Sequence, residues 1–226
     1  MSINFKKLGE TKVTTALMLV NIAVFIIMTL HGGSEDIDNL VRFGAMVKPL
    51  VKLGQWWRIF TAAFIHIGFF HILFNMYFLY SIGPLFEKLY GSRNFLIIYL
   101  LAGIMGNLFT YAFASNNTVS AGASTSLYGI FGLAIGLMIN YRDDDILRGL
   151  GASFLSIIAI NVVYSLFATG IGIQGHIGGF LAGVILAGIF PVVHRQLPMT
   201  TIIISLLAFV VLSILFIIIG NKSVGI

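Results

Sequence analysis

The chain contains no cysteine and few charged residues. Its 226 residues include 13 Lys and Arg and 8 Asp and Glu, so only 9% are charged, whereas about a quarter of the residues in a soluble domain are charged. Without cysteine there are no disulfides, thiolate metal sites or cysteine nucleophiles. The shortage of charge excludes an ordinary soluble domain, and the net charge of +5 gives no reason to expect a nucleic-acid partner.

Carboxylates are also missing from the depths of the long apolar segments. The eight acidic residues lie in the N-terminal tail, one long loop and the predicted cytoplasmic turns: Glu10, Glu35, Asp36, Asp38, Glu87, Asp143, Asp144 and Asp145. This distribution excludes an aspartyl mechanism inside a membrane. His66 and His71 are five residues apart with no Glu between them, so the metalloprotease pattern is absent. We predict no metal site and no cofactor.

What the chain does contain is apolar sequence in long stretches. Hydrophobic residues make up 58% of it, and the mean hydropathy is +1.01. A helix needs about 20 apolar residues to cross a bilayer. The sequence therefore predicts an all-α membrane protein, a polytopic bundle of seven transmembrane helices near residues 13–30, 71–90, 95–114, 122–140, 147–167, 174–192 and 200–220.

We divide the chain into three parts. Residues 1–12 are a predicted cytoplasmic tail, and residues 13–192 form a six-helix core that includes a long interfacial loop at 33–70. Residues 193–226 supply a linker, the seventh helix and a short tail. The Gly-rich loop at 168–175 is a predicted mobile cap over the core.

The distribution of Lys and Arg predicts the orientation. Positively charged residues concentrate in cytoplasmic segments, and the short loops 115–121 and 168–173 contain none. We therefore predict a multi-pass cell-membrane protein whose N-terminus is cytoplasmic and whose partner is the lipid bilayer; its oligomeric state is left unassigned. Eight positive residues lie on the cytoplasmic side: Lys6, Lys7, Lys12, Lys88, Arg93, Arg142, Arg148 and Arg195.

Two side chains suited to catalysis fall at one depth in this topology. Ser124 and His176 each begin an apolar segment that runs from the outside inwards. A serine hydroxyl becomes a nucleophile when a base takes its proton, and histidine is the usual base. A neutral imidazole is also the least costly titratable base to bury. The sequence predicts a Ser–His pair within the membrane, opening to the outer face.

Neighbouring residues complete this predicted site. His71 and Asn75 are four residues apart, so they share one face of their helix. Together with the backbone N–H groups at the helix start near Ser124, they predict an oxyanion hole. Small residues every fourth position, including Gly179 and Gly183, predict that the helices bearing Ser124 and His176 pack closely.

Taken in chain order over residues 10–190, these motifs resemble the rhomboid family of intramembrane serine proteases. Gly122 to Ser124 resembles the family's nucleophile motif, and Tyr128 resembles the tyrosine that packs against the catalytic histidine there. His176 with Gly179 resembles the helix that bears the base. The resemblance implies that Ser124 and His176 form a catalytic dyad supported by Tyr128, Gly122 and Gly179.

The long loop and the second apolar segment carry further parts of the resemblance. His66, His71 and Asn75 are similar to the family's H-x4-H-x3-N pattern, in which the second His and the Asn stabilise the oxyanion. Trp57 and Arg58 resemble the tryptophan–arginine pair of the first loop. This resemblance implies oxyanion roles for His71 and Asn75, and supporting roles for His66, Trp57 and Arg58.

One position departs from the family pattern. Thr125 follows the serine, where the family usually has Gly. By resemblance, that glycine faces Gly179 across the contact between the two helices. We therefore expect the Thr125 side chain to disturb the packing there, or to be absorbed by a local shift.

The resemblance implies an intramembrane serine endopeptidase that cleaves transmembrane proteins in or near their membrane segment. The alternative is a non-catalytic rhomboid-like protein that binds transmembrane helices, and Thr125 is its only support. A transporter or channel would have charged residues at mid-membrane positions and repeat symmetry between its halves, and the sequence shows neither.

Overall fold

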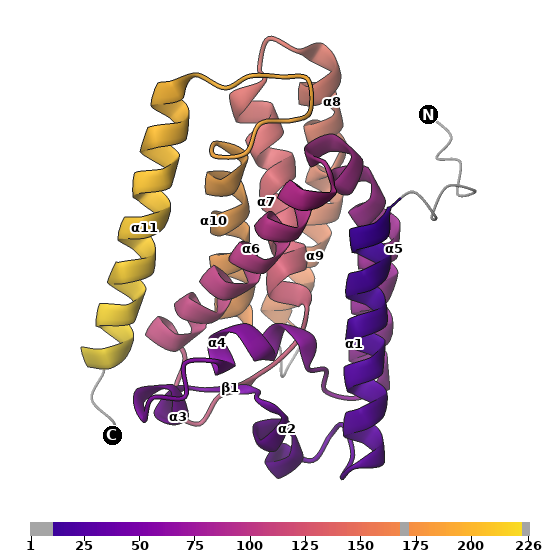
Figure 1. The fold of residues 1–226 in the computed structure, drawn as a ribbon, viewed down its shortest axis with the longest axis vertical. Helices are drawn as coiled ribbons and strands as arrows, with labels where there is room; N and C mark the ends of the chain where they lie inside the picture. The colour runs from indigo at the N-terminus through magenta and orange to yellow at the C-terminus, as the bar shows by residue number, and fades with distance from the viewer. Residues whose placement is uncertain (1–10, 168–171, 223–226) are drawn as a thin grey trace.

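The computed structural model describes residues 11–167 and 172–222, with the backbone alone for 164–167. The described part is a bundle of helices with a group of short elements at one end (Figure 1). The predicted N-terminal tail lies outside the described residues except for Thr11 and Lys12. Half of the predicted cap loop, residues 168–171, also lies outside them.

Helices occupy all seven predicted places. Within the described residues, five helical stretches are long and apolar enough to cross a membrane. They are α1 (Lys12–Leu30), α5 (Phe69–Tyr90), α6 (Ser92–Phe113), α11 (Met199–Lys222) and the pair α8 (Asp145–Ser153) and α9 (Leu155–Phe167), which is interrupted at Phe154. Two apolar helices are shorter, α7 (Ser124–Asn140) and α10 (Ile173–Ala187). The polytopic helical bundle is thus shown, and seven crossings remain a prediction.

Close backbone packing joins the two short helices at the centre of the bundle. A Cβ added to Gly179 would collide with the carbonyl oxygen of Thr125, and one added to Gly183 would collide with that of Gly129. In lipid, where no hydrophobic force drives helices together, such close approach gives the van der Waals contact that holds them. The predicted close packing of these helices is confirmed.

The long loop folds into short elements at the end of the bundle where α1 finishes. They are α2 (Ile37–Phe43), β1 (Met46–Val47), α3 (Lys48–Lys52), α4 (Arg58–Thr61) and the 3₁₀ helix η2 (Ala62–Phe64). Strand β1 pairs antiparallel with β2 (Val119–Ser120), so the loop is attached to the segment that leads into α7. The all-helical expectation missed this two-residue ladder, because such short strands have no alternation to detect.

A buried cation attaches the same loop to α6. Lys48 is 4% exposed, and its ammonium group donates to the carbonyl oxygens of Ala112 (3.3 Å) and Ala114 (3.2 Å). These carbonyls end α6, where a positive charge is favoured by the helix dipole. Burial, with a smaller effect of Lys52, lowers the pKa of Lys48.

A buried carboxylate holds the start of α1 at the opposite end. Glu87 accepts hydrogen bonds from the Thr14 backbone N–H and hydroxyl, both at 2.7 Å, and from the Val13 N–H at 3.0 Å. Ser92 donates to it as well, at 2.6 Å. The carboxylate of α5 therefore caps α1, since the first N–H groups of a helix have no partner within it.

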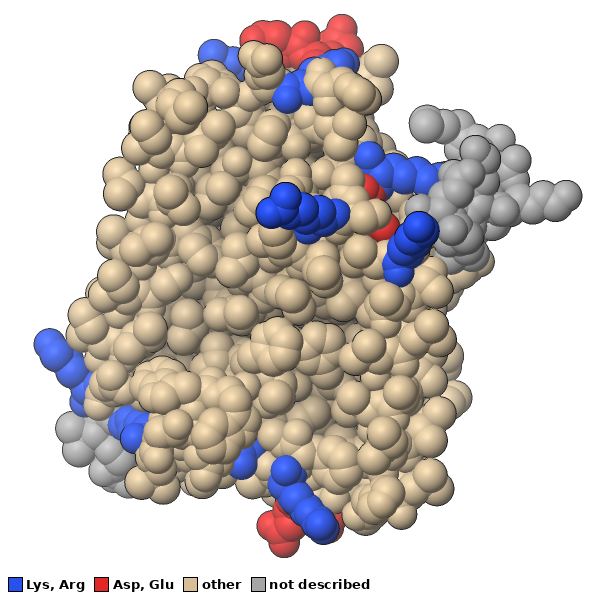
Figure 2. All heavy atoms as spheres, in the orientation of Figure 1, with Lys and Arg blue, Asp and Glu red and all other residues tan. Residues whose placement is uncertain are grey.

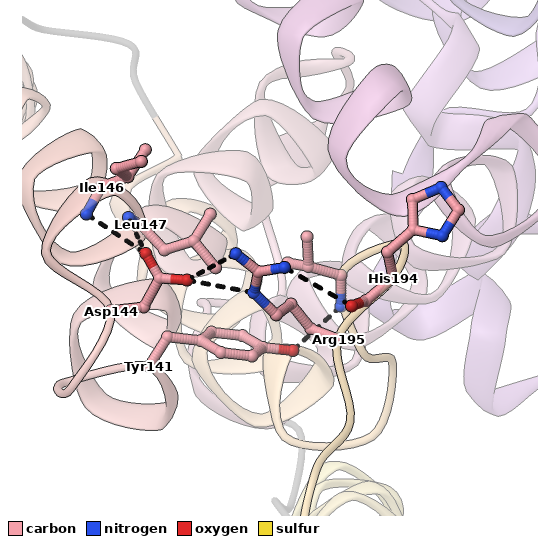
Figure 3. A network of polar contacts seen from close by, with 7 residues as sticks. Tyr141, Asp144, Ile146, Leu147, His194 and Arg195 are labelled. Atoms are coloured by element: carbon pink, nitrogen blue, oxygen red, sulfur yellow. Dashed lines mark hydrogen bonds and ion pairs between the residues drawn. The ribbon is translucent and has the colours of Figure 1, made fainter.

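A polar network ties the turn after α7 to the segment after α10 (Figure 3). Asp144 accepts from the N–H of Leu147 at 3.2 Å, which caps α8, and from Arg195 at 2.9 and 3.0 Å. The Tyr141 hydroxyl accepts from the N–H of Val192 at 2.9 Å.

On the face drawn in Figure 2, charged residues gather toward the two ends and leave an apolar band between them.

Candidate active site

Ser124 and His176 lie side by side in the structure. Ser124 is the first residue of α7, and His176 lies in the first turn of α10. The Nε2 atom of His176 is 3.0 Å from the Ser124 hydroxyl oxygen, which is a hydrogen-bond distance. His176 is 9% exposed, so the pair is largely shielded. An imidazole in this position can take the hydroxyl proton.

Tyr128 fixes the plane of the His176 ring. The two rings stack with centroids 4.0 Å apart and planes 8° apart. The Tyr128 hydroxyl donates to the carbonyl oxygen of Asn161 in α9, at 2.9 Å. Tyr128 therefore contacts the candidate base with its ring and α9 with its hydroxyl. The Asn161 carbonyl was not predicted, because a backbone acceptor leaves no signal in the sequence.

His71 lies on the other side of the Ser124 loop, against Gly122. Gly122 has a φ of +133° and donates its N–H to Ala62. A Cβ there would lie 2.8 Å from Nε2 of His71 and 3.4 Å from the Ser124 hydroxyl, so only glycine suits this position. The Ile67 N–H donates to Nδ1 of His71 at 3.2 Å. This bond assigns the proton of a neutral His71 to Nε2, which faces the Ser124 loop.

Asn75 lies one turn further along α5 and is 5% exposed. Its amide nitrogen donates to the carbonyl oxygen of His71 at 2.8 Å. An asparagine amide has two N–H groups, so one remains for a ligand. The Asn75 side-chain oxygen is buried and has no hydrogen-bond partner among the described residues.

His66 supports the loop that leads to Ser124. It is completely buried, its Nε2 accepts from the N–H of Ala123 at 3.3 Å, and its ring centroid is 5.3 Å from that of His71. Burial, with a smaller effect of His71, lowers the pKa of His66 to about 3. His66 is therefore a neutral acceptor at physiological pH and holds the loop between Gly122 and Ser124.

Trp57 and Arg58 lie in the long loop, and their contacts are with that loop. Trp57 is 56% exposed, as suits an aromatic residue at a membrane interface. Arg58 is buried and donates to the carbonyl oxygens of Val41 (2.6 Å) and Ala45 (2.9 Å), and to the Gln55 side chain (2.7 Å). The guanidinium thereby closes the turn between α2 and α4.

The atoms of Thr125 nearest to Gly179 belong to its backbone, not to the side chain that was expected to disturb the packing or to be absorbed by a local shift. The backbone carbonyl of Thr125 makes that contact, and the side chain points between α6 and α10 instead. A Cβ added to Gly106 would lie 2.9 Å from Cβ of Thr125, and one added to Gly175 would lie 2.8 Å from its Cγ2. Two glycines on neighbouring helices thus leave room for the threonine.

These groups together suit acyl transfer. A hydroxyl nucleophile has a base in contact with it, and the N–H of His71 and the N-terminus of α7 lie beside it. Such donors stabilise the negative oxygen that develops when a carbonyl is attacked.

Comparison with known proteins agrees with this arrangement. Residues 53–193 match the family model described as the Rhomboid domain. The chain is 36% identical over 175 residues to rhomboid protease GluP of Bacillus subtilis (strain 168), covering 77% of this chain and 34% of that protein. It is 27% identical to rhomboid protease AarA of Providencia stuartii, covering 89% and 80% of the two chains.

A third similar protein is Rhomboid-like protease 1 of Toxoplasma gondii, 34% identical over 148 residues, with 64% of this chain and half of that protein covered. The chain thus spans a third to a half of the length of two of these relatives. The family model covers more than half of this chain, including both central helices. The chain belongs to the rhomboid family.

Proposed function

We propose that this protein is an intramembrane serine endopeptidase that uses a Ser124–His176 dyad. The observation that carries the proposal is the 3.0 Å contact between Nε2 of His176 and the Ser124 hydroxyl, with Tyr128 stacked on the imidazole. The family and its named protease members support the same chemistry.

The mechanism follows from the groups in contact. His176 takes the hydroxyl proton as the Ser124 oxygen bonds to the carbonyl carbon of the scissile peptide. The negative oxygen that forms is held by the Nε2–H of His71, an amide N–H of Asn75 and the backbone N–H of Ser124. His176 then gives its proton to the leaving amine and the C–N bond breaks. Water attacks the acyl carbon as His176 takes its proton, the C–O bond to Ser124 breaks, and His176 returns the proton to the serine oxygen.

The lengths of the central helices support a site within the membrane. The 17 residues of α7 and 15 of α10 span about 25 and 22 Å, less than the roughly 30 Å of a hydrocarbon core. We propose seven crossings with a cytoplasmic N-terminus. In that arrangement both short helices begin below the outer surface, so Ser124 and His176 lie at a shallow depth open to the outside.

The proposed substrates are membrane-anchored proteins cut in or near their transmembrane segment. A peptide bond in a regular helix is shielded by the turns around it, so the substrate has to unwind locally. Residues that weaken helices, such as Gly and Pro, favour this step.

The dyad is tested by labelling the purified protein in detergent with a fluorophosphonate probe. We expect wild type to label and both Ser124→Ala and His176→Ala to lose labelling by about 10³-fold or more, since each removes one half of a unit that acts together. Ser126→Ala is the matched control: it removes a buried serine from the same helix and should still label.

Wild type that labels no better than Ser124→Ala, while showing the same thermal unfolding, would contradict the dyad. That result would favour the non-catalytic alternative, in which the chain binds transmembrane helices. Retention of labelling in His176→Ala would leave Ser124 reactive but exclude His176 as its base.

A further inference from the structure

The last helix, α11, lies outside the region that the family model matches, which ends at residue 193. Most of its surface faces outwards, and Ile214, for example, is 52% exposed. Two of its residues are buried, Phe216 and Gly220. They are four residues apart, so they share one face of the helix. Both lie in the last two turns of α11, which ends at the end of the bundle where α10 begins (Figure 1).

This buried face packs on α6. The Phe216 ring meets the Phe109 ring edge to face, with the ring centroids 5.1 Å apart. A Cβ added to Gly220 would collide with the Tyr111 ring, so the backbone of α11 lies directly against that ring. The Tyr111 hydroxyl donates to the side-chain oxygen of Asn221 at 2.5 Å. Aromatic packing and one hydrogen bond thus fix the end of α11 to the last turns of α6.

Phe109 also packs on α10. A Cβ added to Gly178 would collide with Cβ of Phe109, and Gly178 is two residues beyond His176. Phe109 therefore contacts Phe216 of α11 with its ring and Gly178 of α10 at its Cβ. A single side chain of α6 connects the buried face of α11 to the turn that carries the candidate base.

The first turns of α10 depend on their neighbours because they are rich in glycine. Gly175, Gly178 and Gly179 surround His176 in the sequence. Glycine favours helix less than any residue except proline, and it has no side chain that could lock one helix against another. The position of His176 is therefore set by the surfaces on which these glycines rest. They are the Thr125 carbonyl of α7 on one side and α6 on the other.

The Ser–His pair tolerates little movement of this turn. Nε2 of His176 is 3.0 Å from the Ser124 hydroxyl oxygen, and a misplacement of about 1 Å can cost on the order of 10²-fold in rate. Without Phe216, the Phe109 ring would lose a packing partner, and the first turns of α10 would rest on a less rigid surface.

We propose that α11 positions the candidate base: Phe216, packed on Phe109, holds the first turns of α10 so that His176 stays within reach of Ser124. Phe216 acts through α6 and α10 and is a positioning residue. The inference rests on the proposed function, because it assigns a role in the same reaction. It predicts that loss of Phe216 slows the reaction of a bound acyl or phosphonyl group and leaves the binding step unchanged.

Labelling kinetics with a fluorophosphonate probe test the proposal on the full chain in detergent. Rates at several probe concentrations separate the limiting rate of bound probe from the concentration that gives half of it. For Phe216→Ala we expect a limiting rate about 10-fold lower or more, and a half-saturating concentration within about twofold of wild type. Phe216→Leu keeps an apolar side chain against Phe109 and should recover most of the limiting rate.

Two further variants complete the test, with each rate measured below the thermal unfolding range of that variant. Ile214→Ala is the matched control, because it shortens an exposed side chain of the same helix, and it should label like wild type. Asn221→Ala removes the acceptor of the Tyr111 hydroxyl at an exposed position, and we expect a limiting rate a few-fold lower.

A folded Phe216→Ala that labels at the wild-type limiting rate would overturn the inference. Equal losses in Phe216→Ala and Ile214→Ala would do the same, because they would show a general effect of shortening side chains on α11. If Phe216→Ala does not fold, Asn221→Ala decides, and a wild-type limiting rate there would overturn the inference. Wild type that labels no better than Ser124→Ala would instead overturn the proposed function, and this inference with it.

Discussion

His66 acts as a hydrogen-bond acceptor that does not titrate near neutral pH. Its Nε2 receives the N–H of Ala123, one residue before the candidate nucleophile. A protonated His66 would lose this acceptor and place a positive charge inside the protein, beside His71. The burial that lowers its pKa to about 3 therefore also keeps the nucleophile loop in place.

This depressed pKa predicts an acid-dependent loss of stability. Between pH 6.5 and about 3 the unfolded chain binds a proton at His66 that the folded chain does not, so stability falls as the pH falls, by up to about 1.4 kcal/mol per pH unit. His66→Gln keeps an acceptor but cannot titrate, and we expect a shallower decline over this range. Denaturant titrations in detergent at several pH values measure both slopes, and equal slopes would contradict the prediction.

The sequence predicted the side chains of the candidate site and missed contacts that depend on the backbone. Ser124, His176, His71 and Asn75 were predicted because acyl-transfer chemistry requires these residue types and because their spacing matches a known pattern. Lys48 looked like an ordinary interfacial lysine. Its role depends on its contact with the last carbonyl groups of α6. That contact is set by the tertiary structure, and the spacing of charges along the loop does not reveal it.

At the scale of helices, the contact of α6, α7 and α10 depends on how small residues and one threonine interlock. Gly106 and Gly175 leave the space that the Thr125 side chain fills. Cores of this density respond to a single added methyl group. The threonine is thus part of the packing in this chain, and the family's usual glycine at its position is replaced without removing any group of the candidate site.

A double-mutant cycle tests this interlock. Gly175→Ala places a methyl group 2.8 Å from Cγ2 of Thr125 and should destabilise the protein by about 1–3 kcal/mol, as overpacking does. In a Thr125→Ala background that methyl contact is gone, so we expect a smaller loss and a coupling energy above about 0.5 kcal/mol. Thermal or denaturant unfolding in detergent gives all four values.

Gly149→Ala provides the control, because a Cβ at this glycine of α8 meets nothing within 4 Å. We expect it to leave stability unchanged or to raise it slightly, since alanine favours helix more than glycine. Additive effects of Gly175→Ala and Thr125→Ala would mean that the two side chains do not meet.

The positions of the helices were predictable, and their internal interruptions were not. Apolar stretches long enough to cross a membrane located every long helix. The helix is interrupted at Phe154, between α8 and α9, and this residue is neither proline nor glycine, so the sequence does not indicate the break. The β1–β2 ladder likewise joins segments about 70 residues apart, and no local pattern reveals that pairing.

Across the whole molecule, buried cations hold the end of the bundle that carries the site, whereas carboxylates, buried at Glu87 and partly open at Asp144, hold the opposite end. The end that carries the site is held by buried donors such as Lys48 and Arg58. At the opposite end, Asp144 and Arg195 form an ion pair at 2.9 Å that is partly open to solvent. This pair joins the start of α8 to the segment between α10 and α11 (Figure 3).

We expect substitutions of Asp144 to lower the thermal unfolding midpoint in a fixed order. Asp144→Asn removes the carboxylate charge that pairs with Arg195 but keeps an oxygen that can cap α8. Asp144→Ala removes both the charge and the capping oxygen, so alanine should lower the midpoint more. Asp143→Ala, at the exposed neighbouring position, should have little effect. A larger effect at Asp143 than at Asp144 would contradict the assigned network.

The Asp144–Arg195 ion pair should weaken in acid. Hydrogen bonds from the Leu147 N–H and from Arg195 lower the pKa of Asp144. The contribution of the Asp144 carboxylate to stability is therefore present above the ordinary carboxyl pKa of about 4 and is lost as the pH falls through the folded-state pKa. The gap in midpoint between wild type and Asp144→Asn should therefore close below that range and should narrow in high salt.

The shortness of α7 has a consequence for where a substrate is cut. Its 17 residues end at a turn attached to the segment after α10, so on the proposed topology the nucleophile stands about 25 Å from the cytoplasmic boundary. The protein then works as a ruler that measures from the inner surface. Each 1.5 Å added to the bilayer thickness would place the site further below the outer surface, so the cut, counted from the outer end of a substrate's membrane segment, would move by about one helical residue.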